Sequence, residues 1–220
     1  MDAVLFDLDG TLTNPYIGIT SGFQHALAKM GRDVPERDVL KIYIGPPIEQ
    51  GIASALGSDD PAEIEAAVKQ YRSYYDAQGL FENHIYDGIV EVLAALTDMG
   101  VPLFVATSKI EGAARRIVTH FGLEPYFKEI YGSFAGGARA DKGELIKALL
   151  EAEGLASDRV VMIGDRKYDL IGARKNKVTS IGVLWGFGTQ DELEQEEPAH
   201  LAANPAELLP VLRQFAADAR

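Results

Sequence analysis

The sequence predicts an α/β fold, a doubly wound parallel sheet with a small α-helical domain inserted after the first strand. Short β-rich runs alternate with stretches of helical periodicity along most of the 220 residues. The β-rich runs are almost continuously apolar, as in parallel strands that helices cover on both faces. Between the first run and the second, residues 15–79 hold helical patterns but no β-rich run. This interruption of the strand–helix–strand order predicts the inserted domain.

Five runs are expected to form the parallel strands, because each is short, apolar and rich in β-branched or aromatic residues. They span residues 4–8, 101–107, 128–133, 160–164 and 179–185. Apolar stripes at three- and four-residue spacing predict helices before the second, third and fourth runs. The stripes span residues 90–96, 113–121 and 145–150, and the helices are expected to stop near Gly100, Gly122 and Gly154.

Four helices are expected in the insertion, separated by turns rich in glycine and proline. They span residues 17–30, 36–44, 48–56 and 61–78. The last has the clearest start, since Asp60 stands at the N-cap position and Pro61 in the first turn. We therefore expect two domains, an α/β core of residues 1–14 and 80–220 and a helical domain of residues 15–79.

The amino-acid composition excludes several classes of binding partner and of catalytic site. The formal net charge is -12, and such a field repels phosphate backbones and anionic lipid, so neither nucleic acid nor a membrane is expected to bind. The absence of cysteine excludes a thiol nucleophile and a cysteine-ligated zinc. With no apolar run of membrane-spanning length and no signal-peptide pattern, a cytoplasmic protein is expected, as a monomer or a homodimer.

Polar clusters follow directly on four of the β-rich runs. Their sequences are Asp7-Leu8-Asp9-Gly10-Thr11, Thr107-Ser108-Lys109, the stretch GDRKYD at 164–169, and Gly186-Phe187-Gly188-Thr189. The carboxyl ends of parallel strands share one edge of a sheet, and ligands bind in the crevice there. We therefore expect these four clusters to meet, although they lie far apart in the sequence.

Charge indicates what such a site would hold. The carboxylates of Asp7, Asp9, Asp165 and Asp169 would repel one another if they converged uncompensated. Mg²⁺ resolves this repulsion, because it takes a few carboxylate or carbonyl oxygens and keeps positions for water and phosphate. Hydroxyls such as that of Thr107, a lysine, and backbone N–H groups around Gly10 can then donate to a bound phosphate.

Taken in order, these motifs resemble those of the haloacid dehalogenase superfamily of phosphatases. The elements of the resemblance are DLDGT after the first strand, a strand-terminal Thr-Ser, a lysine that opens a helix, and GDRKYD. The resemblance extends from Val4 to the GFG loop near residue 188, and the helical insertion matches the position of that superfamily's smaller cap domain. The segments FDLDGTL, IGPPIEQ, GIVEVLAAL and WGFGT are most similar to phosphoglycolate-phosphatase-like members with a helical cap.

The resemblance implies that the protein is a Mg²⁺-dependent phosphatase of a small phosphorylated metabolite. It makes Asp7 the nucleophile that forms an aspartyl-phosphate, and Asp9 the group that protonates the leaving oxygen and then activates water. Asp7, the main-chain carbonyl of Asp9 and Asp165 would bind the metal. Asp169 would lie close, supporting the metal's water shell.

The remaining roles concern the phosphoryl group. The resemblance assigns Thr107 to its oxygens and Lys142 to the charge on Asp7 and the phosphoryl group. Ser108 is a further phosphate contact, although many relatives carry asparagine there. Relatives often have proline where Gly143 follows the lysine, and Lys147 competes for the lysine's role.

Each assignment also has a structural interpretation. Asp165 can cap the helix after its strand, Asp9-Gly10 can form a simple turn, and Thr107 and Ser108 can cap a helix near Ile110. Lys142 can be a solvated first-turn lysine, and the acidic run at 191–197 a solvated surface segment.

Three functions stay open from the sequence. The first is a phosphatase of the phosphoglycolate-phosphatase or 5′-nucleotidase type. The second is a phosphomutase, which passes the phosphoryl group to another sugar hydroxyl. The third is a phospho-accepting signalling or binding module, which would have no need of an acid–base group at Asp9.

Overall fold

The computed structural model describes residues 1–134 and 139–218, and it divides into two compact units. The first, which we call the core unit, comprises Met1–Thr13 and Ile85–Arg220. The second, which we call the helical unit, comprises Asn14–His84. Two short strands, β2 (Thr13–Asn14) and β3 (His84–Ile85), pair where the chain passes from one unit to the other.

A parallel sheet of six strands forms the centre of the core unit, in the order β5-β4-β1-β6-β7-β8. The strands are β1 (Ala3–Phe6), β4 (Leu103–Ile110), β5 (Glu129–Ser133), β6 (Val160–Gly164), β7 (Thr179–Val183) and β8 (His200–Ala202). Every pair of neighbours runs parallel, which confirms the predicted doubly wound α/β fold. The sequence analysis missed β8, which spans three residues and pairs with β7 at the sheet edge.

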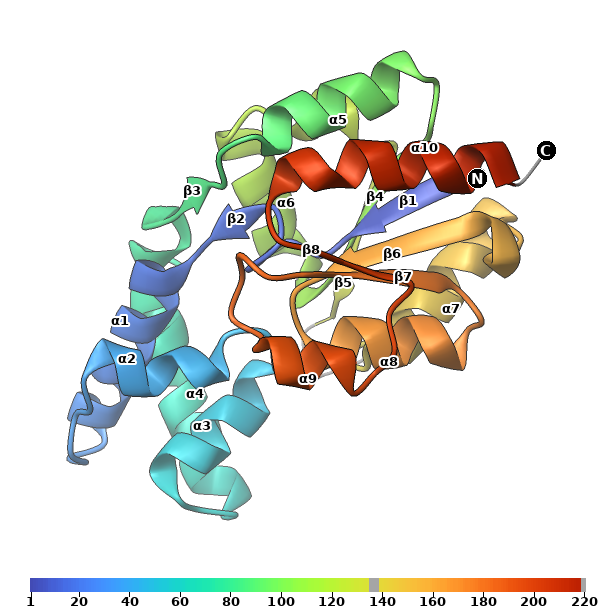
Figure 1. Ribbon diagram of the computed structural model, residues 1–220. Coiled ribbons are helices and arrows are strands. Elements are labelled where there is room, and N and C mark those ends of the chain that lie inside the picture. Colours follow the sequence, from blue (N-terminus) through green and yellow to red (C-terminus); the bar gives the residue numbers. More distant parts are fainter. Residues whose placement is uncertain (135–138, 219–220) are drawn as a thin grey trace. The chain divides into compact units, whose positions relative to one another are not determined.

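Helices cover both faces of this sheet. They are α5 (Ile89–Asp98), α6 (Glu111–His120), α7 (Lys142–Glu153), α8 (Lys167–Lys175), α9 (Gln190–Glu194) and α10 (Leu208–Asp218), with single 3₁₀ turns at η3 (Glu124–Tyr126), η4 (Ser157–Arg159) and η5 (Pro205–Glu207). Figure 1 shows α5 and α10 on one face, and α7 and α8 on the other. The crossover helices predicted before the second, third and fourth strands are thereby observed as α5, α6 and α7.

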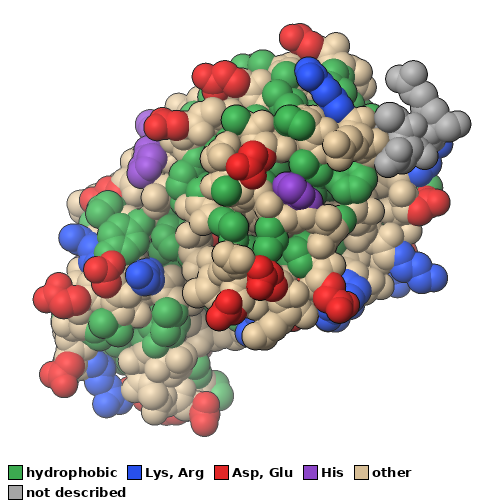
Figure 2. All heavy atoms as spheres, in the orientation of Figure 1, with side chains coloured by type: hydrophobic (Ala, Val, Ile, Leu, Met, Phe, Trp, Pro, Cys, Tyr) green, Lys and Arg blue, Asp and Glu red, His purple; other side chains and the backbone are tan. Residues whose placement is uncertain are grey.

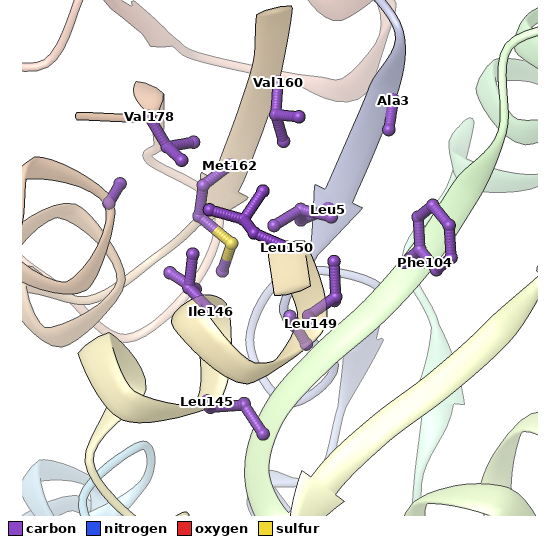
Figure 3. Close-up of a cluster of buried hydrophobic side chains, with 12 residues drawn as sticks. Ala3, Leu5, Phe104, Leu145, Ile146, Leu149, Leu150, Val160, Met162 and Val178 are labelled. Carbon is purple, nitrogen blue, oxygen red and sulfur yellow. The ribbon is translucent and has the colours of Figure 1, made fainter. Parts of the chain in front are cut away.

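A buried apolar cluster fixes α7 against the sheet. Leu5 of β1 and Met162 of β6 lie beside Ile146 and Leu149 of α7, and none of these side chains is exposed (Figure 3). Burial of each such side chain contributes about 1.5–3 kcal/mol. Since this packing sets the position of α7, it also sets where the first residue of that helix, Lys142, presents its side chain.

The helical unit has its own small core. Its elements are α1 (Tyr16–Lys29), α2 (Arg37–Leu40), η1 (Lys41–Tyr43), α3 (Ile48–Leu56), α4 (Pro61–Tyr75) and η2 (Gly79–Phe81). Aromatic rings fill the space between α1 and α4, with Phe23 and Tyr71 at 5.4 Å and Tyr71 stacked on Tyr75 at 5.2 Å. Asp60 caps α4 as predicted, because its side chain accepts a hydrogen bond from Ala62 N at 3.0 Å.

Two details of this unit differ from the sequence-based prediction. The helix expected at 36–44 is a single α-helical turn followed by the 3₁₀ turn η1. The unit also runs on to His84 rather than to residue 79. The reason is local packing, since Gly18 N in α1 donates to the carbonyl of Glu82 at 3.2 Å and ties this segment to the first helix.

The surface carries the negative charge that the composition requires. Acidic side chains are spread over the face displayed in Figure 2, where lysines and arginines form no continuous basic patch. Among the described residues, no helix has the length and the apolar character that a membrane span needs.

Candidate active site

The DLDGT segment leaves the sheet at Asp7. The strand β1 ends at Phe6, and its ladder extends one residue further, because Asp7 N donates to the carbonyl of Ile163 at 2.9 Å. Beyond it the chain turns at Gly10, whose φ is +89°, and the N–H groups of Leu12 and Thr13 both donate to the carbonyl of Leu8. The direction of the Asp9 side chain is therefore not set by the alternation of side chains along strand β1. The strand expected over residues 4–8 ends at Phe6, and the turn at Gly10 determines the position of Asp9.

Asp165 lies at the centre of the converging loops and is completely buried. Its Oδ2 accepts from Phe187 N at 2.8 Å, and its Oδ1 accepts from the hydroxyl of Thr11 at 3.3 Å. A Cβ atom at Gly10 or Gly186 would overlap this carboxyl group. Two loops can therefore approach Asp165 only because they carry glycine at these positions.

The interpretation of Asp165 as a helix cap does not hold. The helix α8 begins after Arg166, which occupies the N-cap position. Asp169, in the first turn of α8, accepts from Arg166 N through Oδ2 at 3.2 Å. The side chain of Asp165 instead faces the loops from β1 and β7, where its partners are Thr11 and Phe187.

Three of the predicted acids form one compact cluster. Asp7, Asp165 and Asp169 each offer a carboxylate oxygen, and these oxygens lie within 4.8 Å of one another. All three side chains are buried. Carboxylate oxygens gathered in this way are the donor set that Mg²⁺ prefers. The side chain of Asp9 is outside this group of three.

Lys142 compensates part of the charge of this cluster. It is the first residue of α7, after the N-cap Asp141, and is 4% exposed. Its ammonium nitrogen lies 2.9 Å from Asp7 Oδ1 and 2.7 Å from Asp169 Oδ1. It donates a hydrogen bond to the carbonyl of Ala106 at 2.8 Å. The interpretation of Lys142 as a solvated lysine is therefore wrong.

Lys147, the alternative lysine that the sequence offered for this role, lies on the surface. Its side chain is 69% exposed and pairs at 3.9 Å with Glu151, which is equally exposed. One helix thus carries both lysines, and burial distinguishes them.

Lys109 is the site residue that the sequence analysis did not assign. Its Nζ lies 2.7 Å from Asp9 Oδ2, with 9% of the lysine side chain and 11% of the aspartate side chain exposed. The available signal was its position, since it is the basic residue of the polar cluster after β4, at the edge where the acids converge. Its partner was not apparent from sequence, because the turn at Gly10 determines where Asp9 points.

Thr107 and Ser108 lie at the same sheet edge, in the last part of β4. Thr107 is 2% exposed, and its hydroxyl accepts from Lys109 N at 3.3 Å. The hydroxyl of Ser108 donates to the carbonyl of Ala140 at 3.3 Å, so it is directed toward the backbone just before α7. Neither residue caps α6, whose N-cap is Ile110 with no side-chain hydrogen bond.

Burial shifts the protonation equilibria of the acids. Burial raises the pKa of Asp9, although the ammonium of Lys109 opposes the shift. Burial, and then the charges of Asp169 and Asp7, raise the pKa of Asp165 well above its usual range. Burial also raises the pKa of Asp169, to about 6, against the opposing charge of Lys142. Burial alone would lower the pKa of Lys142, but the carboxylates of Asp169 and Asp7 outweigh it and raise that pKa.

The charges of the site do not balance. When ionised, the four carboxylates face the two ammonium groups of Lys109 and Lys142, so two negative charges remain. Within the described part of the chain, Oδ1 of Asp7, Asp9 and Asp169 is buried without a hydrogen bond of acceptable geometry. A divalent cation supplies both the missing charge and a partner for carboxylate oxygens. The residues present therefore fit the Mg²⁺ that the motifs imply.

Comparisons with known proteins bear on the family. Residues 4–183 match the family of haloacid dehalogenase-like hydrolases. A 5′-nucleotidase of Pseudomonas aeruginosa is 48% identical over 209 residues, which are 95% of this chain and 94% of that protein. The tyrosine-protein kinase PtkA of Mycobacterium tuberculosis is 41% identical over 192 residues, which are 87% of this chain and 65% of that protein. A crystal structure of a predicted phosphatase from Clostridium acetobutylicum has a TM-score of 0.93 at 38% identity, and the match covers 97% of this chain and 98% of that one.

The chain belongs to the haloacid dehalogenase-like hydrolases. The resemblance seen in the sequence motifs is thereby confirmed. Relatives named as nucleotidase or phosphatase identify this hydrolase as a phosphatase.

In this hydrolase, an ion pair connects GDRKYD with the acidic run near the C-terminus. Arg166 Nε lies 2.9 Å from Glu192 Oε1, and the backbone N–H of Lys167 donates to the same oxygen at 2.9 Å. Glu192 belongs to α9, whose N-cap is Thr189 of the GFGT loop. The acidic run at 191–197 is therefore not only a solvated segment. One of its members fixes the loop that contacts Asp165.

Proposed function

We propose that this phosphatase hydrolyses a small phosphomonoester in a Mg²⁺-dependent reaction, through an aspartyl-phosphate on Asp7. The observation that carries the proposal is the environment of Asp7. This carboxylate is buried beside the ammonium of Lys142 at 2.9 Å and close to the carboxylates of Asp165 and Asp169. A nucleophile in such a place has a cation to balance the charge of an incoming phosphoryl group and carboxylates that can hold a metal.

Two aspartates divide the chemistry in this proposal. A carboxylate oxygen of Asp7 attacks phosphorus, the bond from phosphorus to the leaving oxygen breaks, and Asp9 gives its proton to that oxygen. Water then attacks the phosphoryl group, Asp9 takes a proton from the water, and the bond from Asp7 to phosphorus breaks. The raised pKa of the buried Asp9 supports its part as the acid.

Asp7 and Asp165, with the main-chain carbonyl of Asp9, would hold Mg²⁺ in this proposal. When bound, the ion would supply positive charge that offsets the repulsion between the negatively charged phosphate oxygens and the carboxylates of the site. Asp169 is paired through Oδ1 with the ammonium of Lys142 at 2.7 Å, and its Oδ2 accepts a hydrogen bond from Arg166 N. We therefore assign Asp169 to orienting the lysine and the metal's water rather than to direct ligation.

The phosphoryl oxygens would be bound by donors at the same edge. Lys142 is the charged donor, and the buried hydroxyl of Thr107 is the neutral one. Backbone N–H groups in the turn at Gly10 add to them. Ser108 is the weakest of the proposed contacts, because its hydroxyl is directed at the carbonyl of Ala140.

The substrate we favour is a nucleoside 5′-monophosphate. The support is the relative named 5′-nucleotidase, which is 48% identical over nearly the whole of both chains. Phosphoglycolate and sugar phosphates are the other small phosphorylated metabolites to compare. The helical unit is the proposed cap domain, which in enzymes of this design excludes water and selects among substrates.

The experiment is a phosphate-release assay on that panel of compounds, with Mg²⁺ and with EDTA, for the wild type and Asp7→Asn. We expect turnover that requires Mg²⁺ and is lost in the variant, and intact mass after an acid quench should detect a phosphoryl adduct on the wild type alone. Equal activity of Asp7→Asn would exclude Asp7 as the nucleophile, and undiminished turnover in EDTA would exclude the metal.

Transfer of the phosphoryl group to an acceptor other than water is the second candidate. The observation that favours testing it is the relative named tyrosine-protein kinase, at 41% identity. A phosphomutase or a phospho-accepting signalling module would share the same aspartyl-phosphate. Product analysis separates them, since a hydrolase releases inorganic phosphate, a mutase isomerises a sugar phosphate, and a signalling module keeps a long-lived phosphorylated state without turnover.

A further inference from the structure

We propose that Lys109 is a positioning residue for Asp9. It would hold the carboxylate through Oδ2 and leave Oδ1 as the oxygen that exchanges the proton with the leaving group and with water. This inference rests on the proposed function of Asp9 as acid and base. It adds a residue that acts on proton transfer and not on the phosphate itself.

The first support is the unequal environment of the two oxygens of Asp9. Oδ2 lies 2.7 Å from Lys109 Nζ, whereas Oδ1 is buried and has no hydrogen-bond partner among the described residues. A buried acceptor without a partner is costly, and native structures contain few such atoms. The ion pair therefore fixes one oxygen and leaves the other available for chemistry.

The second support is that the backbone of Lys109 is itself held in place. Lys109 N donates to the hydroxyl of Thr107 at 3.3 Å, and the carbonyl of Ser108 accepts from the hydroxyl of Ser133 at 2.8 Å. Ile110, the next residue, pairs with Ser133 across β4 and β5. A lysine anchored in this way can restrain the acid it touches.

The third support is that Lys142, the more deeply buried lysine of the site, is engaged elsewhere. Lys142 lies between Asp7 and Asp169 and donates to the carbonyl of Ala106. Asp9 forms an isolated bridge with Thr13 just before the turn at Gly10, and the cation that pairs with its side chain at 2.7 Å is Lys109. Lys109 is thus the cation placed to orient Asp9, and the two lysines have different tasks.

A double-mutant cycle tests the proposal. Lys109→Met should lower kcat about 10–100-fold while KM changes less than threefold, because general acid–base catalysis as a whole contributes about 10²–10⁴-fold. Asp9→Asn with Lys109→Met should be no slower than Asp9→Asn alone, because the lysine acts only through the aspartate. Lys109→Arg, which keeps the ion pair, should restore part of the rate.

Lys128→Met is the matched control. Lys128 also pairs with a carboxylate at 2.7 Å, that of Glu153, but its side chain is 58% exposed and it lies on the surface. We expect this variant to keep the wild-type kcat and KM. Circular dichroism and the thermal midpoint of each variant establish that it is folded, and Lys109→Gln replaces Lys109→Met if the latter is not.

A second readout separates proton transfer from a structural defect. The ratio kcat/KM is compared for phenyl phosphate, whose leaving group needs a proton, and 4-nitrophenyl phosphate, whose leaving group needs one much less. Lys109→Met should lose more on phenyl phosphate. An equal loss on both esters would overturn the proposal.

Other outcomes are equally decisive. A KM raised more than tenfold with kcat retained would mean that Lys109 binds the substrate phosphate directly, and fully multiplicative losses in the cycle would mean that it does not act through Asp9. Both would overturn this inference while leaving Asp7 as nucleophile. An active Asp7→Asn would overturn the proposed function itself, so the two failures are distinguishable.

Discussion

Lys142, the first residue of α7, places its ammonium nitrogen 2.9 Å from Oδ1 of Asp7, the first residue after β1. The apolar cluster that fixes α7 on the sheet maintains this contact between two segments far apart in sequence (Figure 3). A cation at the N-terminus of a helix is unfavourable by itself, because the helix dipole is positive there. The carboxylates of Asp7 and Asp169 offset that cost, so the arrangement depends on all three groups.

Lys142→Met should abolish turnover and lower the stability of the metal-free protein. Removal of one partner from a buried ion pair leaves uncompensated charge, which costs about 3–5 kcal/mol, and here two carboxylates would lose their common partner. Denaturant unfolding in EDTA measures the loss, and phosphate release measures the activity. Lys147→Met, in the exposed part of the same helix, is the control and should change neither quantity. A Lys142→Met variant as stable as the wild type would contradict the burial argument.

Mg²⁺ should stabilise the protein more at pH 7.5 than at pH 5. In the folded, metal-free protein the pKa values of Asp165 and Asp169 are raised, the latter to about 6. Such groups favour folding below the pKa of the unfolded chain, and this contribution is lost as pH rises from about 4 through about 6. The ionised carboxylates are then available to bind the metal. At a free Mg²⁺ concentration of one hundred times the Kd, binding would add about 2.7 kcal/mol to the free energy of unfolding.

The measurement is the difference in thermal midpoint between Mg²⁺ and EDTA at several pH values. Taking this difference removes the contribution of ionisable groups elsewhere in the protein. We expect the difference to be small at pH 5 and to grow through pH 6. A difference independent of pH would contradict a metal site made of these carboxylates.

The fold and the segments that form the candidate site were predictable because their signals are local. Apolar runs and helical stripes gave five of the six parallel strands and the helices between them. DLDGT and GDRKYD stand at strand ends, where a parallel sheet brings them together. The sequence alone therefore predicts that Asp7, Asp165 and Asp169 share one site, and their carboxylate oxygens lie within 4.8 Å of one another.

The features that were not predicted depend on contacts between distant residues. The strand β8 is three residues long and is defined by its pairing with β7. Lys109 has no distinguishing neighbour in sequence, since its partner Asp9 is directed by the turn at Gly10. Glu192 lies in an acidic run that looks solvated, and its pairing with Arg166 is tertiary.

Asp165→Asn and Asp169→Asn should separate direct metal ligation from support. The side chain of Asp165 accepts from Phe187 N and from the hydroxyl of Thr11, whereas that of Asp169 lies 2.7 Å from the ammonium of Lys142. We expect Asp165→Asn to abolish measurable Mg²⁺ activation. Asp169→Asn should raise the Mg²⁺ concentration for half-maximal activity about 10–100-fold, as replacement of a group that supports metal ligands does. Titration of activity with Mg²⁺ measures both, and the reverse order of effects would reverse the two assignments.

Gly186→Ala should damage the site through Asp165 without altering any charged group. The added Cβ would overlap the carboxyl group of Asp165, so either that side chain or the loop after β7 must move. Overpacking of this kind typically costs about 1–3 kcal/mol, and a displaced Asp165 would also weaken Mg²⁺ binding. Thermal unfolding in EDTA and Mg²⁺ titration of activity measure the two effects separately.

Gly112→Ala is the control for that substitution. Gly112 lies in α6, and a Cβ built there meets no atom within 4 Å. Gly112 is the second residue of α6, where alanine is compatible with the helix, so this variant should be at least as stable as the wild type and fully active. If Gly186→Ala behaved like Gly112→Ala, the loop after β7 would be free to retreat from Asp165. The hydrogen bond from Phe187 N to Asp165 Oδ2 would then be dispensable for metal binding.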